Sequence, residues 1–502
     1  MTVSFAACVT VALVALSGCG STATPSASDA SLPADAGPGV DAGALAEADI
    51  ATALGCGTPP GVVGQAAAGE LQLLPIDTTQ FPDALCNDGT APVLYYRPYR
   101  GEANRNRWSI TLRGGGSCSD AESCAARWCA CSPSNPCAHT DYVSGFDLSN
   151  MSGGGRRGNP GHGIDSRDAA NDNPLADYNQ VQFIYCSSDF WIGNARGVRY
   201  TTTHPRTGEP VTYGLHFLGD RILAADLDIV RQEGVAPLVY TVDGGSVAMP
   251  DLDEAEEVVV AGDSAGGVGL VHHLDGIADL LRAHHVGGGG GPEVVGLVDS
   301  AVGPEWARLD WSASVFASAG GDTYASAMAM IDGSPLNHGA FHDASCLAMH
   351  ASDPQLCWDS THVVRHHVTT PFFVRMGLLD PVVSGNTAQL GATDPMLGAL
   401  VTAAGVPRVF AIVLQRELTT FPMLTSSAEE HLALTRAPGV FAPGCPWHDT
   451  IHDDAQTYTV TVDPTGTQPL AMFDVWRAWR TGGVPTTAIT SDPTLADTMC
   501  AR

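Results

Sequence analysis

The residue best placed for nucleophilic chemistry in this sequence is a serine flanked by small residues. Ser264 lies in the stretch GDSAG, after the β-branched run at 258–260 and before a long segment with helical apolar spacing. A serine on a tight turn between a strand and a helix is typical of the nucleophile elbow of serine hydrolases. The five-residue motif alone is weak evidence for a catalytic serine, because glycine accounts for 56 of the 502 residues and chance matches are common. The strand before the serine and the helix after it favour a catalytic role over a chance match.

A catalytic serine needs a base, and the base needs a carboxylate that orients it. In α/β hydrolases the acid and then the histidine follow the serine along the chain. Asp380 stands just beyond a predicted strand at 372–376 and is the candidate acid. His448 lies in a loop that Cys445 could pin, and His452, one helical turn away, is the main rival as base.

A second glycine-rich segment follows another predicted strand. Residues 108–112 lead into Arg113 and three glycines at 114–116. Glycines let backbone N–H groups face a ligand closely, and loops of this kind supply half of the oxyanion hole in α/β hydrolases. An ordinary flexible turn is the alternative. The helix N-terminus behind Ser264 would supply the other half through its N–H groups and dipole.

A parallel sheet is the framework predicted to hold these side chains. Predicted strands alternate with helices, which indicates an α/β, α/β-hydrolase-like fold with a mostly parallel, doubly wound sheet and disulfide-pinned loop insertions. Helical spacing is present at residues 215–230 and in a closing segment at 472–479. The predicted core strands are 92–96, 108–112, 181–185, 258–260, 294–298, 372–376 and, as the last of them, 409–414.

The composition supports one large domain or two ordinary ones. Hydrophobic residues make up 44% of the chain and charged residues 16%, which allows a sizeable core. The formal net charge of −30 argues against nucleic acid as a partner, because such binding needs a basic surface. We expect no metal and no organic cofactor, and the sequence leaves the oligomeric state open.

The first 19 residues are typical of an export signal. Residues 5–16 form an apolar run too short to span a bilayer, and the motif LSGC follows, ending at Cys19. This is similar to a bacterial lipoprotein signal in which Cys19 becomes lipidated, although no basic residue precedes the apolar run. Residues 20–55 are predicted to be a disordered tether and 56–502 a single catalytic domain. We therefore expect an exported protein, secreted or attached to a membrane only through N-terminal lipid; a buried N-terminal helix is the alternative.

The cysteine pattern favours disulfides. Two of the 14 cysteines fall within the predicted signal and lipid site, which leaves an even number, 12, in an exported chain. The pairs Cys346–Cys357 and Cys445–Cys500 are predicted. A zinc cluster that includes His139 is the rival interpretation for a crowded group. That group consists of Cys118, Cys124, Cys129, Cys131 and Cys137.

Five segments, in order along the chain, resemble the pectin acetylesterase family, which includes the Notum carboxylesterases. They are WSITLRGGGSC with CAAR at 124–127, VQFIYCSSDFWIGN, LHFLGDRILAADL, VVVAGDSAGGVG, and FFVRMGLLD with FAPGCPWHDTI. The resemblance extends over residues 95–483 with gaps. An ordered set of motifs is far more specific than any one of them.

Carried over residue by residue, the resemblance implies that Ser264 is the nucleophile, Asp380 the acid and His448 the base. It also implies an oxyanion hole made by the backbone amides of Ala265 and of Gly115 or Gly116. The chain departs from the family at Arg113, where an acidic residue is usual, and at Ser117, where Trp is usual. Both departures flank the acyl site.

The sequence thus predicts a serine carboxylesterase that removes short acyl groups, acetyl above all, from carbohydrates or other polyols. The alternatives are a long-acyl esterase similar to Notum, a catalytically silent carbohydrate-binding lipoprotein, and a surface protein that binds metal through residues 118–139. The natural ester is not evident from the sequence.

Overall fold

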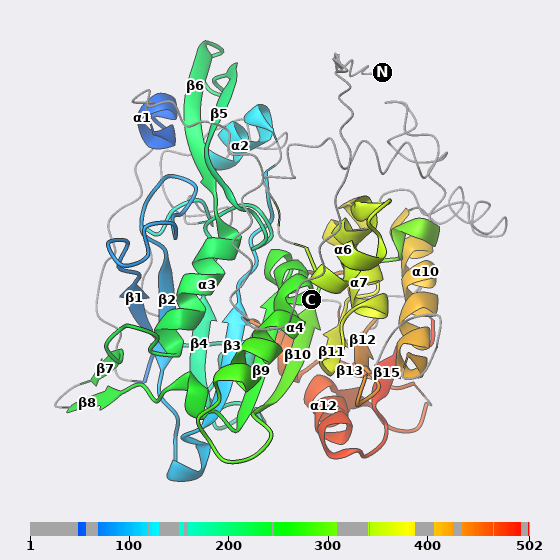
Figure 1. Ribbon diagram of the computed structural model, residues 1–502. Helices are drawn as coiled ribbons and strands as arrows, with labels where there is room; N and C mark the ends of the chain where they lie inside the picture. The colour runs from blue at the N-terminus through cyan, green and yellow to red at the C-terminus, as the bar shows by residue number, and fades with distance from the viewer. Residues whose placement is uncertain are drawn as a thin grey trace, which may run out of the picture. The chain divides into compact units, whose positions relative to one another are not determined.

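A nine-stranded sheet forms the centre of the protein (Figure 1). The computed structural model describes residues 49–56, 69–118, 120–129, 150–154, 159–242, 245–308, 340, 342–386, 406–424, 434–464, 466–492 and 500. In spatial order the strands are β1 (Gln72–Pro75), β2 (Val93–Arg97), β4 (Asn179–Phe183), β3 (Arg107–Leu112), β9 (Glu257–Asp263), β10 (Glu293–Asp299), β11 (Phe372–Arg375), β12 (Gly439–Ala442) and β15 (Thr487–Ile489).

The sheet is mostly parallel, as the sequence predicts. Every neighbouring pair from β4 to β15 is parallel, while β1 and β2 extend the sheet as antiparallel strands. Leu112 at the end of β3 lies opposite Gly262 of β9, and Asp299 of β10 lies opposite Asp263. The carboxyl ends of these three strands therefore meet at one edge of the sheet.

Helices and small hairpins complete the structure. The α-helices are α1 (Ile50–Leu54), α2 (Ala121–Trp128), α3 (Gly219–Val230), α4 (Ala265–His284), α6 (Ala344–Met349), α7 (Ser360–His366), α8 (Pro381–Asn386), α10 (Val406–Thr420), α11 (Asp454–Tyr458) and α12 (Met472–Thr481). The 3₁₀ turns are η1 (Glu102–Asn104), η3 (Gly163–Asp165), η4 (Leu252–Glu254), η5 (Trp306–Arg308), η9 (Pro354–Trp358) and η10 (Phe421–Met423). Three two-stranded sheets are formed by β5 (Ala195–Thr203) with β6 (Pro210–Phe217), β7 (Val239–Val242) with β8 (Gly245–Ala248), and β13 (Thr461–Val462) with β14 (Leu470–Ala471).

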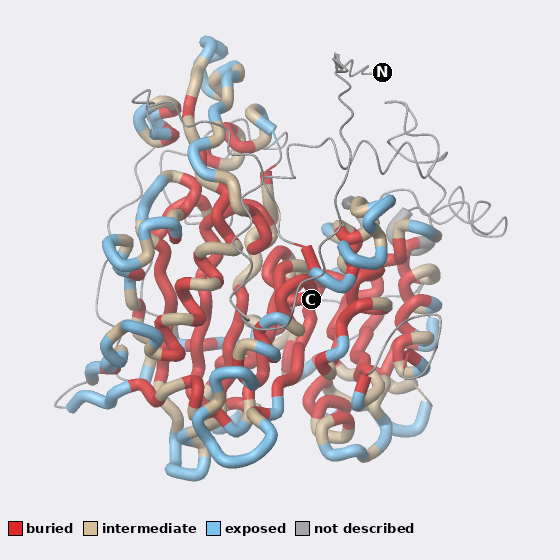
Figure 2. Tube along the Cα trace, viewed as in Figure 1, coloured by how far each residue is buried: buried red, intermediate tan, exposed pale blue. Residues whose placement is uncertain are grey.

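Alternate residues of β9 enter two different apolar cores. Val258 and Val260 belong to a core that includes residues of α3 and α4. Val259 and Ala261 point the other way, into a core that includes Trp476 of α12. Because both faces of a strand in this position are covered, its sequence is a continuous apolar run without alternation. Figure 2 shows the central strands of the sheet as buried along most of their length. The doubly wound architecture is confirmed.

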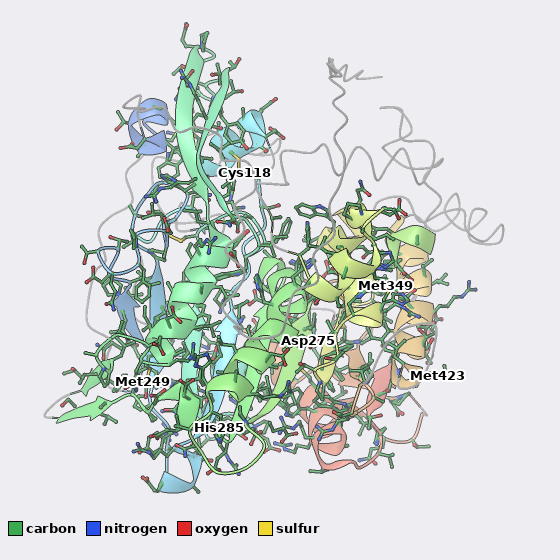
Figure 3. The ribbon with its side chains drawn as sticks, in the orientation of Figure 1. Cys118, Met249, Asp275, His285, Met349 and Met423 are labelled. Atoms are coloured by element: carbon green, nitrogen blue, oxygen red, sulfur yellow. A yellow bond between two sulfur atoms is a disulfide. The ribbon has the colours of Figure 1, made fainter. Side chains whose placement is uncertain are left out.

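Five disulfides are present among the described residues, and the two predicted pairs are confirmed. The bonds are Cys56–Cys129, Cys86–Cys186, Cys118–Cys124, Cys346–Cys357 and Cys445–Cys500. The zinc interpretation fails for the three described cysteines of the crowded group, because all three are in disulfides. One of them, Cys118, is labelled beside α2 in Figure 3. Cys131, Cys137 and His139 lie outside the described residues.

Two predictions about elements are wrong. Residues 409–414, predicted as the last core strand, lie within helix α10. The buried residues there are spaced as on a helix face, at Phe410, Leu414 and Leu418. The helix predicted at 215–230 begins only at Gly219, because the preceding residues end strand β6.

The predicted signal, Cys19 and most of the predicted tether lie outside the described residues. Helix α1, at the end of the range predicted as tether, is described, and both Ile50 and Leu54 are buried. Within the described parts of the chain, every helix is either too short or too polar to cross a bilayer. The five disulfides are consistent with export, since such bonds persist in oxidising compartments.

Candidate active site

Ser264 occupies a strained turn between β9 and α4. Its φ is 52° and its ψ −120°, a backbone conformation that a residue with a side chain rarely adopts. The glycines on either side are required by close packing. A Cβ at Gly262 would lie 2.4 Å from the carbonyl oxygen of Gly266, and one at Gly266 would lie 2.0 Å from that of Leu112. The small residues of the motif therefore let the turn pass directly against β3.

His448 links Ser264 to Asp380. Its Nε2 atom is 2.7 Å from Ser264 Oγ, and its Nδ1 atom is 2.7 Å from Asp380 Oδ2. The other carboxylate oxygen of Asp380 accepts hydrogen bonds from the backbone amides of Val382, at 2.8 Å, and Val383, at 3.1 Å. With Nδ1–H donated to the carboxylate, Nε2 is left to accept the serine proton. This is the arrangement of a base with its orienting acid.

The electrostatics of His448 follow from these contacts. Burial lowers the pKa of His448, but the hydrogen bond and negative charge of Asp380 raise it more, so the net shift is upward. Asp299 and Asp449 add to the upward shift. A base with a raised pKa accepts a proton more readily, although it needs a higher pH to remain neutral.

Asp380 and His448 lie on two loops that are joined by backbone hydrogen bonds. The amide of Leu378 donates to the carbonyl of Pro443 at 2.9 Å, and that of Leu379 donates to the carbonyl of Cys445 at 3.2 Å. Both donors immediately precede Asp380. The disulfide Cys445–Cys500 then ties the histidine loop to the far end of the chain. The loop with Asp380 and the loop with His448 therefore support each other.

Asp299, at the end of β10, anchors the segment that follows His448. Its Oδ2 atom accepts hydrogen bonds from the amides of Thr450, at 2.7 Å, and Ile451, at 3.1 Å. The carbonyl of Asp299 accepts the amide of Ser264 at 2.9 Å. One strand end therefore holds both the nucleophile turn and the histidine loop.

His452, the rival base, lies away from Ser264 Oγ and forms a second Asp–His arrangement. Its Nε2 atom is 2.9 Å from Asp263 Oδ1, and its Nδ1 atom is 3.4 Å from Asp165 Oδ2. Burial and Arg113 lower the pKa of His452, but the two carboxylates outweigh them and raise it to about 9. A charged His452 in turn helps hold the pKa of Asp263 below its usual range.

Asp263 connects this buried ion pair to the glycine-rich loop. Its Oδ2 atom accepts the amide of Gly114 at 2.9 Å. Arg113, the residue that departs from the family pattern, lies 3.7 Å from Asp263 Oδ1 through its Nε atom. Its charge is therefore directed at this buried carboxylate. The indole N–H of Trp191 donates to the carbonyl of Arg113 at 2.9 Å and fixes the start of the loop.

Arg127 of α2 orients the loop from the opposite side. Its guanidinium donates a short hydrogen bond to the carbonyl of Gly115. Because C=O and N–H of a trans peptide point in opposite directions, this bond turns the N–H of Gly116 away from Arg127. Gly116 has φ 69°, which suits glycine. Ala265, the other predicted oxyanion donor, is the first residue of α4, directly after the serine.

Sequence reasoning missed several of these residues. It did not find Asp263, Asp165, Asp299, Trp191 or Arg127 as supports of the site. The segment CAAR carries Arg127, so that motif held a signal, and Asp263 lies inside the elbow motif itself. Nothing local to Asp165 or Asp299 indicates a role, because their partners are far away in the sequence.

The sequence profile described as "Pectinacetylesterase" matches residues 65–479. The chain belongs to the pectinacetylesterase family. The resemblance noted from the sequence is confirmed. The chain is 28% identical over 207 residues to palmitoleoyl-protein carboxylesterase NOTUM of Schmidtea mediterranea, a match that covers 40% of this chain and 31% of that protein.

Plant members of the pectinacetylesterase family are similar over a comparable stretch. Pectin acetylesterase 11 of Arabidopsis thaliana is 23% identical over 198 residues, 39% of either chain. The sequence matches thus span 31% and 39% of these two relatives. The solved structure of the Wnt deacylase Notum from Drosophila superposes with a TM-score of 0.55 at 19% identity, over 84% of this chain and 97% of that chain. It shows that the fold is shared.

Proposed function

We propose that this protein is a serine carboxylesterase that hydrolyses short acyl esters, acetyl above all, of carbohydrates or other polyols. The observation that carries the proposal is the pair of 2.7 Å contacts from Asp380 through His448 to Ser264. Family membership supports it, because relatives are named as a pectin acetylesterase and as protein carboxylesterases.

In the first half of the reaction, Ser264 Oγ attacks the ester carbonyl while its proton moves to Nε2 of His448. Asp380 holds the imidazole tautomer and stabilises the imidazolium that forms. Negative charge develops on the carbonyl oxygen, where the amides of Ala265 and Gly116 would donate. One such donor is worth about a hundred- to a thousandfold in rate.

In the second half, the tetrahedral intermediate collapses and the alcohol leaves with the proton from His448. An acyl group remains on Ser264. Water then attacks this ester, giving its proton to His448. The second tetrahedral intermediate collapses, the acid leaves, and His448 returns the proton to Ser264 Oγ. Every proton that leaves one group is taken up by another, so the cycle needs no cofactor.

The proposal of a short acyl group competes with a specific alternative, a long acyl group. The relatives include palmitoleoyl-protein carboxylesterases, so a long-acyl activity is the second candidate. Ser117, where the family usually has Trp, leaves a smaller side chain beside the glycine-rich loop. Each methylene that a groove buries is worth about 0.8 kcal/mol, or roughly fourfold in kcat/KM.

A chain-length series tests the proposal. Purified protein is assayed on p-nitrophenyl esters from acetyl to octanoyl and on acetylated polysaccharides, beside Ser264→Ala. We expect hydrolysis that falls beyond propionyl or butyryl and that Ser264→Ala abolishes. A steady rise to octanoyl would move the enzyme to the long-acyl side of the family. Carbohydrate binding without any hydrolysis would favour the silent binding protein instead.

We also propose that residues 1–19 are a lipoprotein signal and that the catalytic domain predicted from residue 56 includes helix α1 before it, since Ile50 and Leu54 share a core with residues of β6. The motif before Cys19 and the disulfides support this placement. Mass spectrometry of the N-terminal peptide tests it. Lipid on Cys19 that disappears in Cys19→Ala is the expected result, and an unprocessed N-terminus contradicts it.

A further inference from the structure

A cluster of histidines lies around α7, on elements that take no part in the proposed ester chemistry. His362 and His366 are four residues apart on this helix, which places them on the same face. Glu305 approaches the same face from the segment after β10. Its Oε1 atom is 2.9 Å from His362 Nδ1 and 3.1 Å from His366 Nε2.

We propose that Glu305, His362 and His366 form a binding site for a divalent transition metal ion of the zinc class. Two imidazoles and one carboxylate are a donor set that zinc binds in proteins. A tetrahedral ion with ligands at about 2.0–2.1 Å separates its ligand atoms by roughly 3.3 Å. The separations of 2.9 and 3.1 Å are close to this value, so a shift of a few tenths of an ångström admits the ion.

His350 supplies the outer contact that such a site needs. A metal on Nδ1 of His362 leaves the proton of that ring on Nε2. This atom lies 3.1 Å from Nε2 of His350, which can accept it. Histidine ligands usually donate their second N–H to a neighbour in this way, which fixes the ring orientation. Figure 3 labels Met349, the residue before His350, at the end of α6.

The backbone on both sides of Glu305 is hydrogen-bonded to the start of α7. Gly303 and Thr361 exchange two hydrogen bonds, with the amide of Gly303 donating to Thr361 Oγ1 and that hydroxyl donating to the carbonyl of Gly303, both at 2.9 Å. The amide of Trp306 donates to Asp359 Oδ2 at 2.6 Å. These contacts flank Glu305 on both sides. Because the ligands are already in place, little conformational entropy is lost on binding.

Charge and access also suit a cation. The carboxylate of Glu305 is buried. Its Oε2 atom lies 3.9 Å from Nε of Arg365, but that guanidinium pairs more closely with the carboxylate of Glu417, and the proposed ligand atom, Oε1, faces the two imidazoles. His362 is buried, while the side chain of His366 is 19% exposed, which provides a route from solvent. Zinc that enters here would displace the protons that the imidazoles share with Glu305.

A competing set exists within the same cluster. Cys346 lies near His350, His362 and His367, with ligand atoms close enough to share an ion. Cys346 is bonded to Cys357, however, so its sulfur is unavailable as a thiolate. The remaining three imidazoles carry no negative charge, whereas the set with Glu305 contributes a carboxylate. We therefore assign the ion to Glu305, His362 and His366.

The experiment is a zinc titration of the untagged full-length protein after chelation and dialysis. Isothermal titration and elemental analysis should give one zinc ion per chain, and the thermal midpoint should rise with added zinc but not with magnesium. His366→Gln and Glu305→Gln should each weaken binding at least about a hundredfold. His350→Gln, the outer contact, should weaken it about ten- to a hundredfold.

Two controls make the assignment sharp. His284→Gln alters an exposed histidine at the end of α4 and should leave zinc binding unchanged. His367→Gln tests the competing set, and loss of binding there with retention in His366→Gln would overturn the assignment. A parent protein that holds no zinc at micromolar concentration would also overturn it. Circular dichroism of each metal-free variant checks that it folds, and the partly exposed His366 is the substitution least disruptive to packing.

Discussion

Removing the Cys445–Cys500 disulfide should lower both stability and turnover. The bond closes a loop with a sequence separation of 55, whereas Cys346–Cys357 closes a separate loop with a separation of 11. In the chain-entropy relation, loops of these lengths stabilise the folded state by about 4 and about 3 kcal/mol, respectively. The double variant Cys445→Ala/Cys500→Ala should therefore lose about 1 kcal/mol more than Cys346→Ala/Cys357→Ala.

The two variants should differ more strongly in activity. The carbonyl of Cys445 accepts the amide of Leu379, next to the candidate acid, and His448 follows three residues later. Releasing this loop disturbs the distances on which proton transfer depends, and a displacement of about 1 Å can cost about a hundredfold in rate. The Cys346–Cys357 bond has no such contact with the acid or histidine loop among the described residues.

The assay compares urea unfolding, followed by circular dichroism, with kcat and KM on p-nitrophenyl acetate. We expect kcat of the Cys445/Cys500 variant to fall about tenfold or more, because a displacement of about 1 Å misplaces the histidine loop. The Cys346/Cys357 variant should keep its kcat while losing stability. If both variants retained full turnover, or if only the second lost it, the disulfide would not hold the histidine loop in its active position.

Four further predictions follow from the site and the core. Ser264→Ala and His448→Ala should each remove nearly all ester hydrolysis, and the double variant should lose little more. His452→Gln should keep measurable ester hydrolysis. Full activity in His448→Ala would show that the base is misassigned. Since the pKa of His448 is raised and the base must be neutral, kcat/KM should reach half its maximum at a pH above 6.5, and a midpoint below 6.5 would contradict this. Arg127→Met should lower kcat about tenfold or more with little change in KM, because it frees the carbonyl that orients the oxyanion loop, and Arg127→Lys should restore part of it. Burial raises the pKa of Asp226 well above its usual value, so the folded protein holds this proton more tightly than the unfolded chain. The contribution of Asp226 to stability therefore falls as the pH rises from about 4. In urea unfolding, Asp226→Asn should stabilise the protein more at pH 8 than at pH 5, and an equal effect at both pH values would contradict this.

The sequence predicted the parts of the fold that depend on local pattern. The continuous apolar run before Ser264 indicated a buried strand, and the periodicity after it indicated α4. Residues 409–414 were misassigned because a short apolar run suits a buried strand or a helix equally well. Strand β12, only four residues long, gave no clear signal, although it carries the loop with His448.

The residues of the candidate site were likewise predicted only where a local motif carried them. Ser264, Asp380 and His448 were found from motif order, and the structure brings their side chains together. The supports around them depend on contacts across long sequence separations, such as that between Asp165 and His452. Most aspartates in a protein lie on its surface, so only the folded structure shows which of them are buried and paired.

The order of strands in the sheet has a consequence for how the protein folds. The nucleophile strand β9 lies between β3, which precedes it by about 150 residues, and β10, which follows it. The acid and the histidine come later still, from the ends of β11 and β12. Contacts of such long range are slow to form, since each must first close a large loop. The candidate nucleophile therefore precedes in the chain both side chains that would activate it, and its site is complete only when β11 and β12 have joined the sheet.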